Sequence, residues 1–413
     1  MAIRYSHEWA AYKLRDSGCP SSGFKRIFTR FVIVIAVVCA FSPYIHSQNV
    51  DSAKPTPDHI VTKFLHPGIL HTAADLERIK LKVKAGEEPW KSGFDLFRNS
   101  KFAQFDYKMR GPFDYAGRNP IGHTKEITDD SIAAYQNAIM WAVTGEARHA
   151  RKAAEILNAW SSTLKHFSED KDTILAAGTF GFLFTNAAEI LRYTYPEWKS
   201  SDVVSCQAML HDVFYPVMKD FATFANGNWD AFCIRGLMAI GVFCDDPAMF
   251  KSAADYYRNG SGNGRLTHYV INDAGQCQES GRDQAHTQLG LGLLCDACQI
   301  AWNQGLDLYS DENNRLLKGF EYTARYNLGN DVPFTAFVDT TGKYRQKMIS
   351  GEKRGVFRSI YELAWNHYNQ IGGMEMPFSE QVLLKIRPEG AANLADNCGY
   401  GTLLFSLKAK EPK

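Results

Sequence analysis

The chain has 413 residues, 45% of them apolar, so it can bury a sizeable core in one large domain or two ordinary ones. Charged residues make up 22% of the chain and nearly cancel, leaving a formal net charge of +1. A net charge this small does not favour nucleic acid or an anionic membrane as a partner. An anionic ligand would have to be met by local clusters of charge.

The N-terminal residues have the layout of a signal peptide. Basic residues precede an apolar run over residues 31–41, which is shorter than the roughly 20 residues of a transmembrane helix. We therefore expect residues 1–47 to be a signal peptide or N-terminal leader, and the protein to be exported to the periplasm or the medium. A retained N-terminal anchor is the alternative. The polar residues 48–63 would form a linker before a folded domain over 64–413.

Helical patterns dominate the chain after the linker. Apolar residues recur with the 3.6-residue period of amphipathic helices, and capping residues or helix breakers mark many of the ends. The expected helices cover residues 76–83, 129–143, 146–164, 174–193, 201–221, 229–243, 247–257, 281–302 and 314–326. Because these helical hairpins show no fixed-period repeat, they predict an all-α fold, an incomplete (α/α) toroid or barrel, instead of a regular solenoid. A small β-hairpin is expected within residues 332–349.

The cysteines after the leader show no disulfide spacing. Cys295 and Cys298 form a lone C-x-x-C inside an apolar helical pattern, without a second ligand pair nearby. This context is typical of buried packing residues, in contrast to a metal or redox site. We predict no metal and no other cofactor.

The densest polar cluster lies at the start of the helix expected over 281–302. Residues 276–288 read Gln-Cys-Gln-Glu-Ser-Gly-Arg-Asp-Gln-Ala-His-Thr-Gln. Arg282 and His286 would share one helix face, and Glu279 would align with Arg282 if the helix begins early. The alternative is an ordinary helix start with an acidic turn and a structural ion pair. A cap alone does not need an arginine, an imidazole and several amides together.

Two further polar groups precede expected helices. In the run Asn-Gly-Asn-Trp-Asp, Asn228 would present an amide to a ligand and Trp229 a stacking face to a sugar ring. The alternative is a helix cap and a core anchor. In the third group, Arg118, His123 and then Tyr135 place cationic and phenolic groups on a loop and the helix after it.

At these positions the sequence resembles the alginate lyase domain family of polysaccharide lyases. The resemblance covers most of the chain after the leader, and its segments are 66–70, 129–136, 226–229, 279–286 and 327–334. The string Glu-Ser-Gly-Arg-Asp-Gln-x-His is its most specific part. The resemblance implies an incomplete α/α barrel with a groove or tunnel for an anionic polysaccharide. It also implies metal-independent β-elimination on a 1,4-linked uronic-acid polymer, alginate or else glucuronan, leaving an unsaturated uronate at the new non-reducing end.

The residue types suit this chemistry. The proton at C5 of a uronate is a poor acid while the adjacent carboxylate is negative, so donors must neutralise that charge. A base must then remove the proton, and an acid must protonate the leaving oxygen. We assign Asn228 and Arg282 to neutralisation, His286 to proton abstraction or neutralisation, and a tyrosine to the leaving oxygen, with a further role as base left open.

The sequence departs from the better-known alginate lyases of similar fold. Trp229 stands where they have a histidine, and Leu289 stands seven residues after Arg282, where they have the catalytic tyrosine. The tyrosine therefore cannot be transferred by spacing. We predict Tyr326, with Tyr135, Tyr269 and Tyr361 as alternatives.

The wider substrate-binding set follows from the same three groups. It comprises Arg118, His123, Tyr135, Trp229, Gln278, Glu279 and Gln284. The predicted partner is an anionic polysaccharide, with no nucleic acid and no membrane once the leader is removed; the oligomeric state is not predicted.

Two other functions fit the same residues. One is an inverting glycoside hydrolase that uses the carboxyl groups of Asp230 and Glu279. The other is a non-catalytic glycan-binding protein in which Trp229, Trp141 and Trp160 stack on sugar rings.

Overall fold

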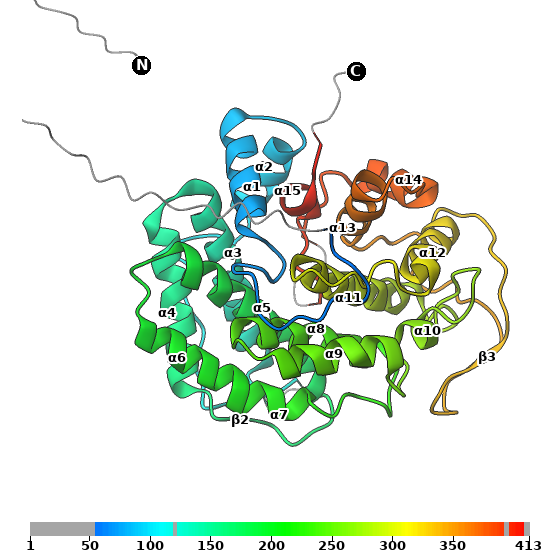
Figure 1. The fold of residues 1–413 in the computed structure, drawn as a ribbon, viewed down its shortest axis with the longest axis horizontal. Helices are drawn as coiled ribbons and strands as arrows, with labels where there is room; N and C mark the ends of the chain where they lie inside the picture. Colours follow the sequence, from blue (N-terminus) through cyan, green and yellow to red (C-terminus); the bar gives the residue numbers. More distant parts are fainter. Residues whose placement is uncertain (1–53, 119–121, 392–395, 409–413) are drawn as a thin grey trace, which may run out of the picture. The chain divides into compact units, whose positions relative to one another are not determined.

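The computed structural model describes residues 54–118, 122–391 and 396–408 (Figure 1). The leader predicted over residues 1–47 and residues 48–53 of the linker predicted over 48–63 lie outside the described residues. The described residues belong to one compact unit. Within it, Thr56 already contacts the helical body, since its N–H donates to the Gly305 carbonyl at 3.1 Å.

Helices make up most of the described chain. They are α1 (Ala73–Ala85), α2 (Trp90–Arg98), α3 (Thr124–Thr144), α4 (Ala147–Thr163), α5 (Thr173–Thr194), α6 (Ser200–Met209), η1 (Leu210–Phe214), α7 (Tyr215–Met218), α8 (Gly227–Phe243), α9 (Pro247–Asn259), α10 (Leu266–Tyr269), α11 (Gln284–Asn303), α12 (Asp311–Asn327), α13 (Tyr361–Trp365), η2 (Asn366–Ile371), α14 (Pro377–Ile386) and α15 (Gly401–Phe405). The strands are β1 (Tyr115–Ala116), β2 (His166–Phe167), β3 (Phe337–Val338) and β4 (Arg345–Gln346).

The chemistry of individual residues explains several helix ends. Thr72 caps α1 in a reciprocal pair: its hydroxyl accepts the Asp75 N–H at 3.2 Å, and the Asp75 carboxylate accepts the Thr72 N–H at 2.9 Å. Gly145 ends α3 with a φ of 72°, a left-handed conformation that glycine adopts without strain.

The inner helices α3, α5, α8 and α11 pack side by side in that order, while α4, α9 and α12 pack on their outer sides. Figure 1 shows α4, α6 and α9 outside and α5, α8 and α11 inside. The prediction of an incomplete (α/α) toroid is confirmed. The close approach of α5 and α8 requires a glycine, because a Cβ on Gly178 would lie 2.8 Å from the Cβ of Phe232.

The inner helices run parallel, so their N-terminal ends meet at one end of the toroid. Trp141, near the end of α3, donates to Thr194 at the end of α5, at 3.0 Å. Arg192 of α5 donates at 2.8 Å to the carbonyl of Phe243, the last residue of α8. At the opposite end, Gly227 N–H, which starts α8, donates at 3.2 Å to Gln278, just before α11.

Most expected helices are present, but the start of α3 was predicted too late. We expected Asp129 and Asp130 to open a helix, whereas α3 begins at Thr124. Asp130 is fully buried instead. Its carboxylate accepts hydrogen bonds from Tyr107, the backbone of Arg110 and Trp160, each at 2.9 Å. Asp130 is therefore not a helix cap. Its partners from distant parts of the chain satisfy the carboxylate and explain why an acidic residue lies inside an apolar helix.

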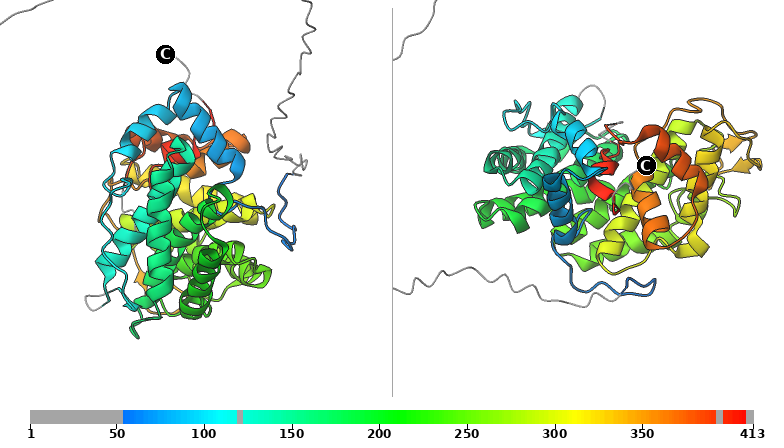
Figure 2. Two further views of the ribbon diagram at one scale, coloured as in Figure 1. Left: turned by 90° about the vertical axis from the view of Figure 1, so that its left-hand side faces the viewer. Right: turned by 90° about the horizontal axis from the view of Figure 1, so that it is seen from above.

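The predicted β-hairpin is confirmed. β3 and β4 pair antiparallel, with Phe337 opposite Gln346, and Figure 2 shows their arrows at the periphery of the unit. The parallel pair β1 and β2 was not predicted; it joins the segments that lead into α3 and α5. One helix among the described residues, α5, is long and apolar enough to cross a membrane, but 94% of its apolar window is buried inside the structure. It is a core helix.

A buried carboxyl in the C-terminal part predicts a pH dependence of stability. Glu389 accepts the N–H groups of Tyr361 at 2.9 Å and Glu362 at 3.3 Å. Burial, followed by the nearby Glu362 carboxylate, raises the pKa of Glu389 to about 8. The folded state therefore holds this proton more tightly than the unfolded state. Its stabilising contribution is complete at low pH and is lost as the pH rises toward about 8.

Between about pH 5 and pH 8, we expect the titration of Glu389 to lower the free energy of unfolding by up to about 1 kcal/mol per pH unit. Glu389→Gln, which cannot titrate, should lack that part of the slope. Urea unfolding of both proteins across this range measures the difference, with the exposed Glu77→Gln as the control. A difference between wild type and Glu389→Gln that does not change with pH would contradict the expectation.

Candidate active site

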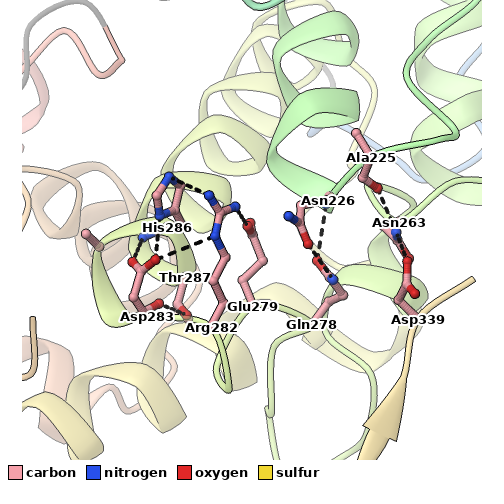
Figure 3. A network of polar contacts seen from close by, with 12 residues as sticks. Ala225, Asn226, Asn263, Gln278, Glu279, Arg282, Asp283, His286, Thr287 and Asp339 are labelled. Atoms are coloured by element: carbon pink, nitrogen blue, oxygen red, sulfur yellow. Dashed lines mark hydrogen bonds and ion pairs between the residues drawn. The ribbon is translucent and has the colours of Figure 1, made fainter. Parts of the chain in front are cut away.

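Arg282 lies at the centre of a polar cluster at the N-terminal end of α11 (Figure 3). Its Nη1 donates to Glu279 Oε1 at 2.7 Å, and its Nη2 lies 3.1 Å from Nε2 of His286. Its Nε is 3.6 Å from Asp283 Oδ2. The arginine and histidine side chains are 34% and 36% exposed. The predicted grouping of Glu279, Arg282 and His286 is therefore present, with the arginine and histidine open to solvent and Glu279 buried.

The local sequence builds this cluster by starting the helix late. We expected a helix from residue 281, but α11 begins at Gln284, with Asp283 as its N-cap. The Asp283 carboxylate accepts both the backbone N–H of His286 at 2.7 Å and its ring Nδ1 at 2.6 Å. The sequence analysis did not include Asp283 in the site. An aspartate directly before a helix is nevertheless a recognisable N-cap signal.

The two carboxyl groups of the cluster differ in environment. Burial raises the pKa of Glu279, which is fully enclosed, and the charge and hydrogen bond of Arg282 act in the opposite direction. Burial also acts to raise the pKa of Asp283, but the hydrogen bonds from the ring and backbone of His286 outweigh it and lower that pKa. Asp283 is thus ionised at neutral pH and accepts from the imidazole.

The start of α8 lies against the same segment. Gln278, next to Glu279, donates to Asn226 Oδ1 at 3.0 Å and accepts the Gly227 N–H. Asn228 follows in the first turn of α8. It is 4% exposed, and its Oδ1 is buried without a hydrogen-bond partner among the described residues. An unpaired buried amide oxygen is costly, which suggests a role beyond packing.

Cationic side chains flank this helix start. Lys171 Nζ lies 5.4 Å above the ring of Phe224, and Lys343 Nζ donates to the Phe224 carbonyl at 3.1 Å. Trp229, partly buried, meets Phe224 edge to face at 5.7 Å. The N-terminal ends of α5 and α8 add the positive ends of their helix dipoles. This end of the toroid therefore favours negative charge.

Asn263 connects the β3–β4 hairpin to the start of α8, and sequence reasoning missed it. Its Nδ2 donates to the Ala225 carbonyl and to Asp339 Oδ2, both at 2.7 Å (Figure 3). Asp339 lies just after β3. No local pattern predicts a contact between residues so far apart in the chain.

The other cationic group lies before α3. His123 stacks on Phe113 with ring centroids 3.5 Å apart and meets Tyr115 edge to face at 4.8 Å. Arg118 is partly exposed on the same loop. Both residues lie at the end of the toroid where the inner helices begin, because α3 starts at Thr124.

Four predicted substrate-binding residues are buried, and their side chains form hydrogen bonds with other parts of the protein. Gln278, Glu279 and Gln284 are each at most 1% exposed. Gln284 donates to the carbonyls of Ser280 and Ser350 and accepts from Asn327. Tyr135 is 2% exposed, and its hydroxyl pairs with His71 at 2.8 Å in the core. Their polar groups are already used by partners within the protein, which argues against direct contact with a substrate.

The candidate catalytic tyrosines differ in the burial and the hydrogen-bond partners of their hydroxyl groups. The hydroxyl of Tyr269 is enclosed by Glu279 and two backbone carbonyls, and that of Tyr361 donates to Gln288 at 3.2 Å. Burial raises the pKa of Tyr135, Tyr269 and Tyr361, which disfavours each as a tyrosinate base. Tyr326 lies in the last turn of α12 and is 6% exposed, and its hydroxyl has no hydrogen-bond partner among the described residues. Its neighbour Asn327 contacts Gln284 of α11.

Cys295 and Cys298 are buried free thiols, as expected for packing residues. Burial raises the pKa of both. Within the described residues, no group of three or more His, Cys, Asp or Glu is arranged to hold a metal ion. That the protein needs no cofactor stays a prediction.

A cavity of about 750 Å³ lies elsewhere, between α2, η2 and α14. Its arginine, Arg387, already donates to Glu362 at 2.9 and 2.6 Å. Arg387 thus gives two of its nitrogens to one buried carboxylate, whereas Arg282 gives only one nitrogen to Glu279.

The fold and the cluster define a class: a toroid of helical hairpins with cationic and amide side chains at one end. A sequence profile of the family described as Alginate lyase matches residues 109–334, more than half of the chain. The chain belongs to the alginate lyase family and is a polysaccharide lyase. No curated protein sequence matches it.

Solved structures share the fold. An alginate lyase from Bacteroides ovatus superposes with a TM-score of 0.58 at 14% identity, covering 83% of this chain and 100% of the other. Alginate lyase A1-III from Sphingomonas species A1 gives a TM-score of 0.57 at 13% identity, covering 83% and 98%. A variant of A1-III complexed with a tetrasaccharide gives 0.59 at 13% identity, covering 85% and 99%.

These findings exclude the two other functions considered. The hydrolase required Asp230 as a catalytic carboxyl group, but Asp230 is fully buried and accepts from Ala222 N–H at 2.8 Å and Gly264 N–H at 3.0 Å. The glycan-binding hypothesis placed Trp229, Trp141 and Trp160 on sugar rings, but Trp160 is fully buried, and Trp141 and Trp229 are partly buried.

Proposed function

We propose that the protein cleaves a 1,4-linked polymer of uronic acids, alginate first and glucuronan second, by β-elimination. The observation that carries the proposal is the partly exposed Arg282, held between Glu279 and His286 where the inner helices begin. A fixed guanidinium at that place can neutralise a sugar carboxylate as charge develops on it. The tetrasaccharide bound by the A1-III variant supports an oligosaccharide as ligand.

In the proposed reaction, Arg282 and Asn228 neutralise the carboxylate at C5. The C5 proton passes to a base, a double bond forms between C4 and C5, and the bond from C4 to the bridging oxygen breaks. Tyr326 gives that oxygen its proton. His286 and the deprotonated Tyr326 are the two candidate bases. Lys171 and Lys343 supply further positive charge for neighbouring uronates of the polymer.

Product analysis tests the reaction type. Incubation with polymannuronate, polyguluronate or glucuronan should produce ultraviolet absorbance, because each elimination creates a double bond conjugated with the carboxylate. Mass spectrometry should find unsaturated ends without added water. A well-folded protein that produces no absorbance from any of the three polymers would overturn the proposal.

We also propose that residues 1–47 direct export to the periplasm or the medium. The support is the basic stretch before a short apolar run. Protein recovered outside the cytoplasm should lack these residues by mass. Recovery of the full-length chain from the cytosol would contradict export.

A further inference from the structure

A chain of hydrogen bonds leads from Asp283 through His286 to Arg282 and ends at Glu279 (Figure 3). Asp283 Oδ2 lies 2.6 Å from Nδ1 of His286, and Nε2 of the same ring lies 3.1 Å from Arg282 Nη2. Arg282 Nη1 then donates to Glu279 Oε1 at 2.7 Å.

Chemistry fixes the direction of these bonds. A guanidinium only donates, so Nε2 of His286 must accept through its lone pair. The imidazole is then neutral and carries its hydrogen on Nδ1, where the ionised Asp283 accepts it. Both partners of His286 therefore select the same tautomer.

The same contacts hold the arginine rigidly. Asp283 fixes the ring and the backbone of His286 at once, because its other oxygen caps α11. On the far side, Glu279 is fully enclosed and accepts from Tyr269 at 3.3 Å. A guanidinium has more N–H groups than Glu279 and His286 use, and the Arg282 side chain stays 34% exposed. Donors therefore remain for a ligand on a side chain that is already ordered.

We propose that Asp283 and His286 are positioning residues for Arg282, and that His286 is not the base that removes the C5 proton. The inference rests on the proposed function, since it concerns the arginine that meets the uronate carboxylate. To act as a base, His286 would have to withdraw its Nε2 lone pair from Arg282. The arginine would then lose a support while negative charge builds on the substrate. The base is left to Tyr326, which must enter the step as the phenolate, take the C5 proton and then pass that proton to the bridging oxygen.

Two substitutions of His286 separate positioning from proton abstraction. The carbonyl oxygen of glutamine can accept from Arg282, yet an amide is not a base at neutral pH. We expect His286→Ala to lose about 100-fold in kcat/KM and His286→Gln to stay within about fivefold of wild type. If His286 were the base, both variants would lose activity alike, and that result would overturn the inference.

Asp283→Asn tests the other half of the pair. Asparagine still caps a helix well, but an NH2 group replaces one of the two carboxylate oxygens. With the remaining oxygen on the backbone N–H, the atom that faces the ring N–H of His286 can no longer accept. We expect a loss of about 10- to 100-fold in kcat/KM on a uronan, with melting temperature and circular dichroism near those of wild type. Activity within about twofold of wild type would overturn the role of Asp283.

A readout independent of activity is the protonation of the His286 ring, measured by long-range nitrogen–proton NMR and assigned by the signal missing from His286→Gln. The wild type should carry its hydrogen on Nδ1, and Asp283→Asn should not hold that tautomer. A hydrogen on Nε2 in the wild type would overturn the inference. A wild type that cleaves no uronan would overturn the proposed function, while the ring protonation would still decide whether His286 accepts from Arg282.

Discussion

Arg282→Ala should lower kcat/KM on a uronan by about a thousandfold. The guanidinium is the only cation with three partners in the described cluster, held by Glu279, His286 and Asp283. Its loss removes charge stabilisation that grows as the C5 proton leaves, and a preorganised donor of this kind contributes about two to three orders of magnitude. Initial rates from ultraviolet absorbance, measured over a range of polymer concentrations, give kcat and KM separately.

Alanine at this position also leaves the buried Glu279 without its arginine, so stability has to be measured alongside activity. Arg282→Lys keeps a positive charge near Glu279 but loses the planar fork, and it should fall between wild type and alanine. The matched control is Arg98→Ala, an arginine 57% exposed on α2, which should leave the rate unchanged. A folded Arg282→Ala with more than a tenth of the wild-type kcat/KM would remove Arg282 from the reaction.

Tyr326→Phe should cost about two to four orders of magnitude in kcat, with a smaller change in KM. The substitution removes one hydroxyl, which gives the leaving oxygen its proton, and general acid–base groups contribute about this much. The ring would keep its stacking contact with Arg354, 3.9 Å away. The same absorbance assay measures the effect.

The best control for this tyrosine is Tyr361→Phe, whose buried hydroxyl donates to Gln288. Its removal should affect stability by about 1 kcal/mol and leave kcat nearly unchanged. If Tyr326→Phe were as active as wild type, the proton donor would be another group, and the assignment of Tyr326 would fail.

Local patterns in the sequence were sufficient for most helices and for the residues grouped around Arg282. The cap at Thr72 and the stop at Gly145 depend on neighbouring residues only, so their chemistry is readable in the sequence. Arg282 and His286 are four residues apart, and that spacing keeps them in contact although α11 begins after Arg282.

The misplaced predictions depend on contacts between distant residues. Asp130 reads as a helix start, but Tyr107 and Trp160 hold it in the interior. Tyr135 reads as a polar residue of a site, but His71, far away in the chain, buries its hydroxyl. A candidate catalytic tyrosine is hard to select for the same reason, because the end of α12 meets the start of α11 only through tertiary contacts such as that of Asn327 with Gln284.

A crystal structure of Tyr326→Phe with a bound tetrauronate tests the central claim most directly, because the variant should bind the polymer without cleaving it. We predict that the carboxylate of one sugar lies about 3 Å from the nitrogens of Arg282, with the amide of Asn228 on the same carboxylate. A well-ordered oligosaccharide whose carboxylates all lie away from Arg282 would contradict the account.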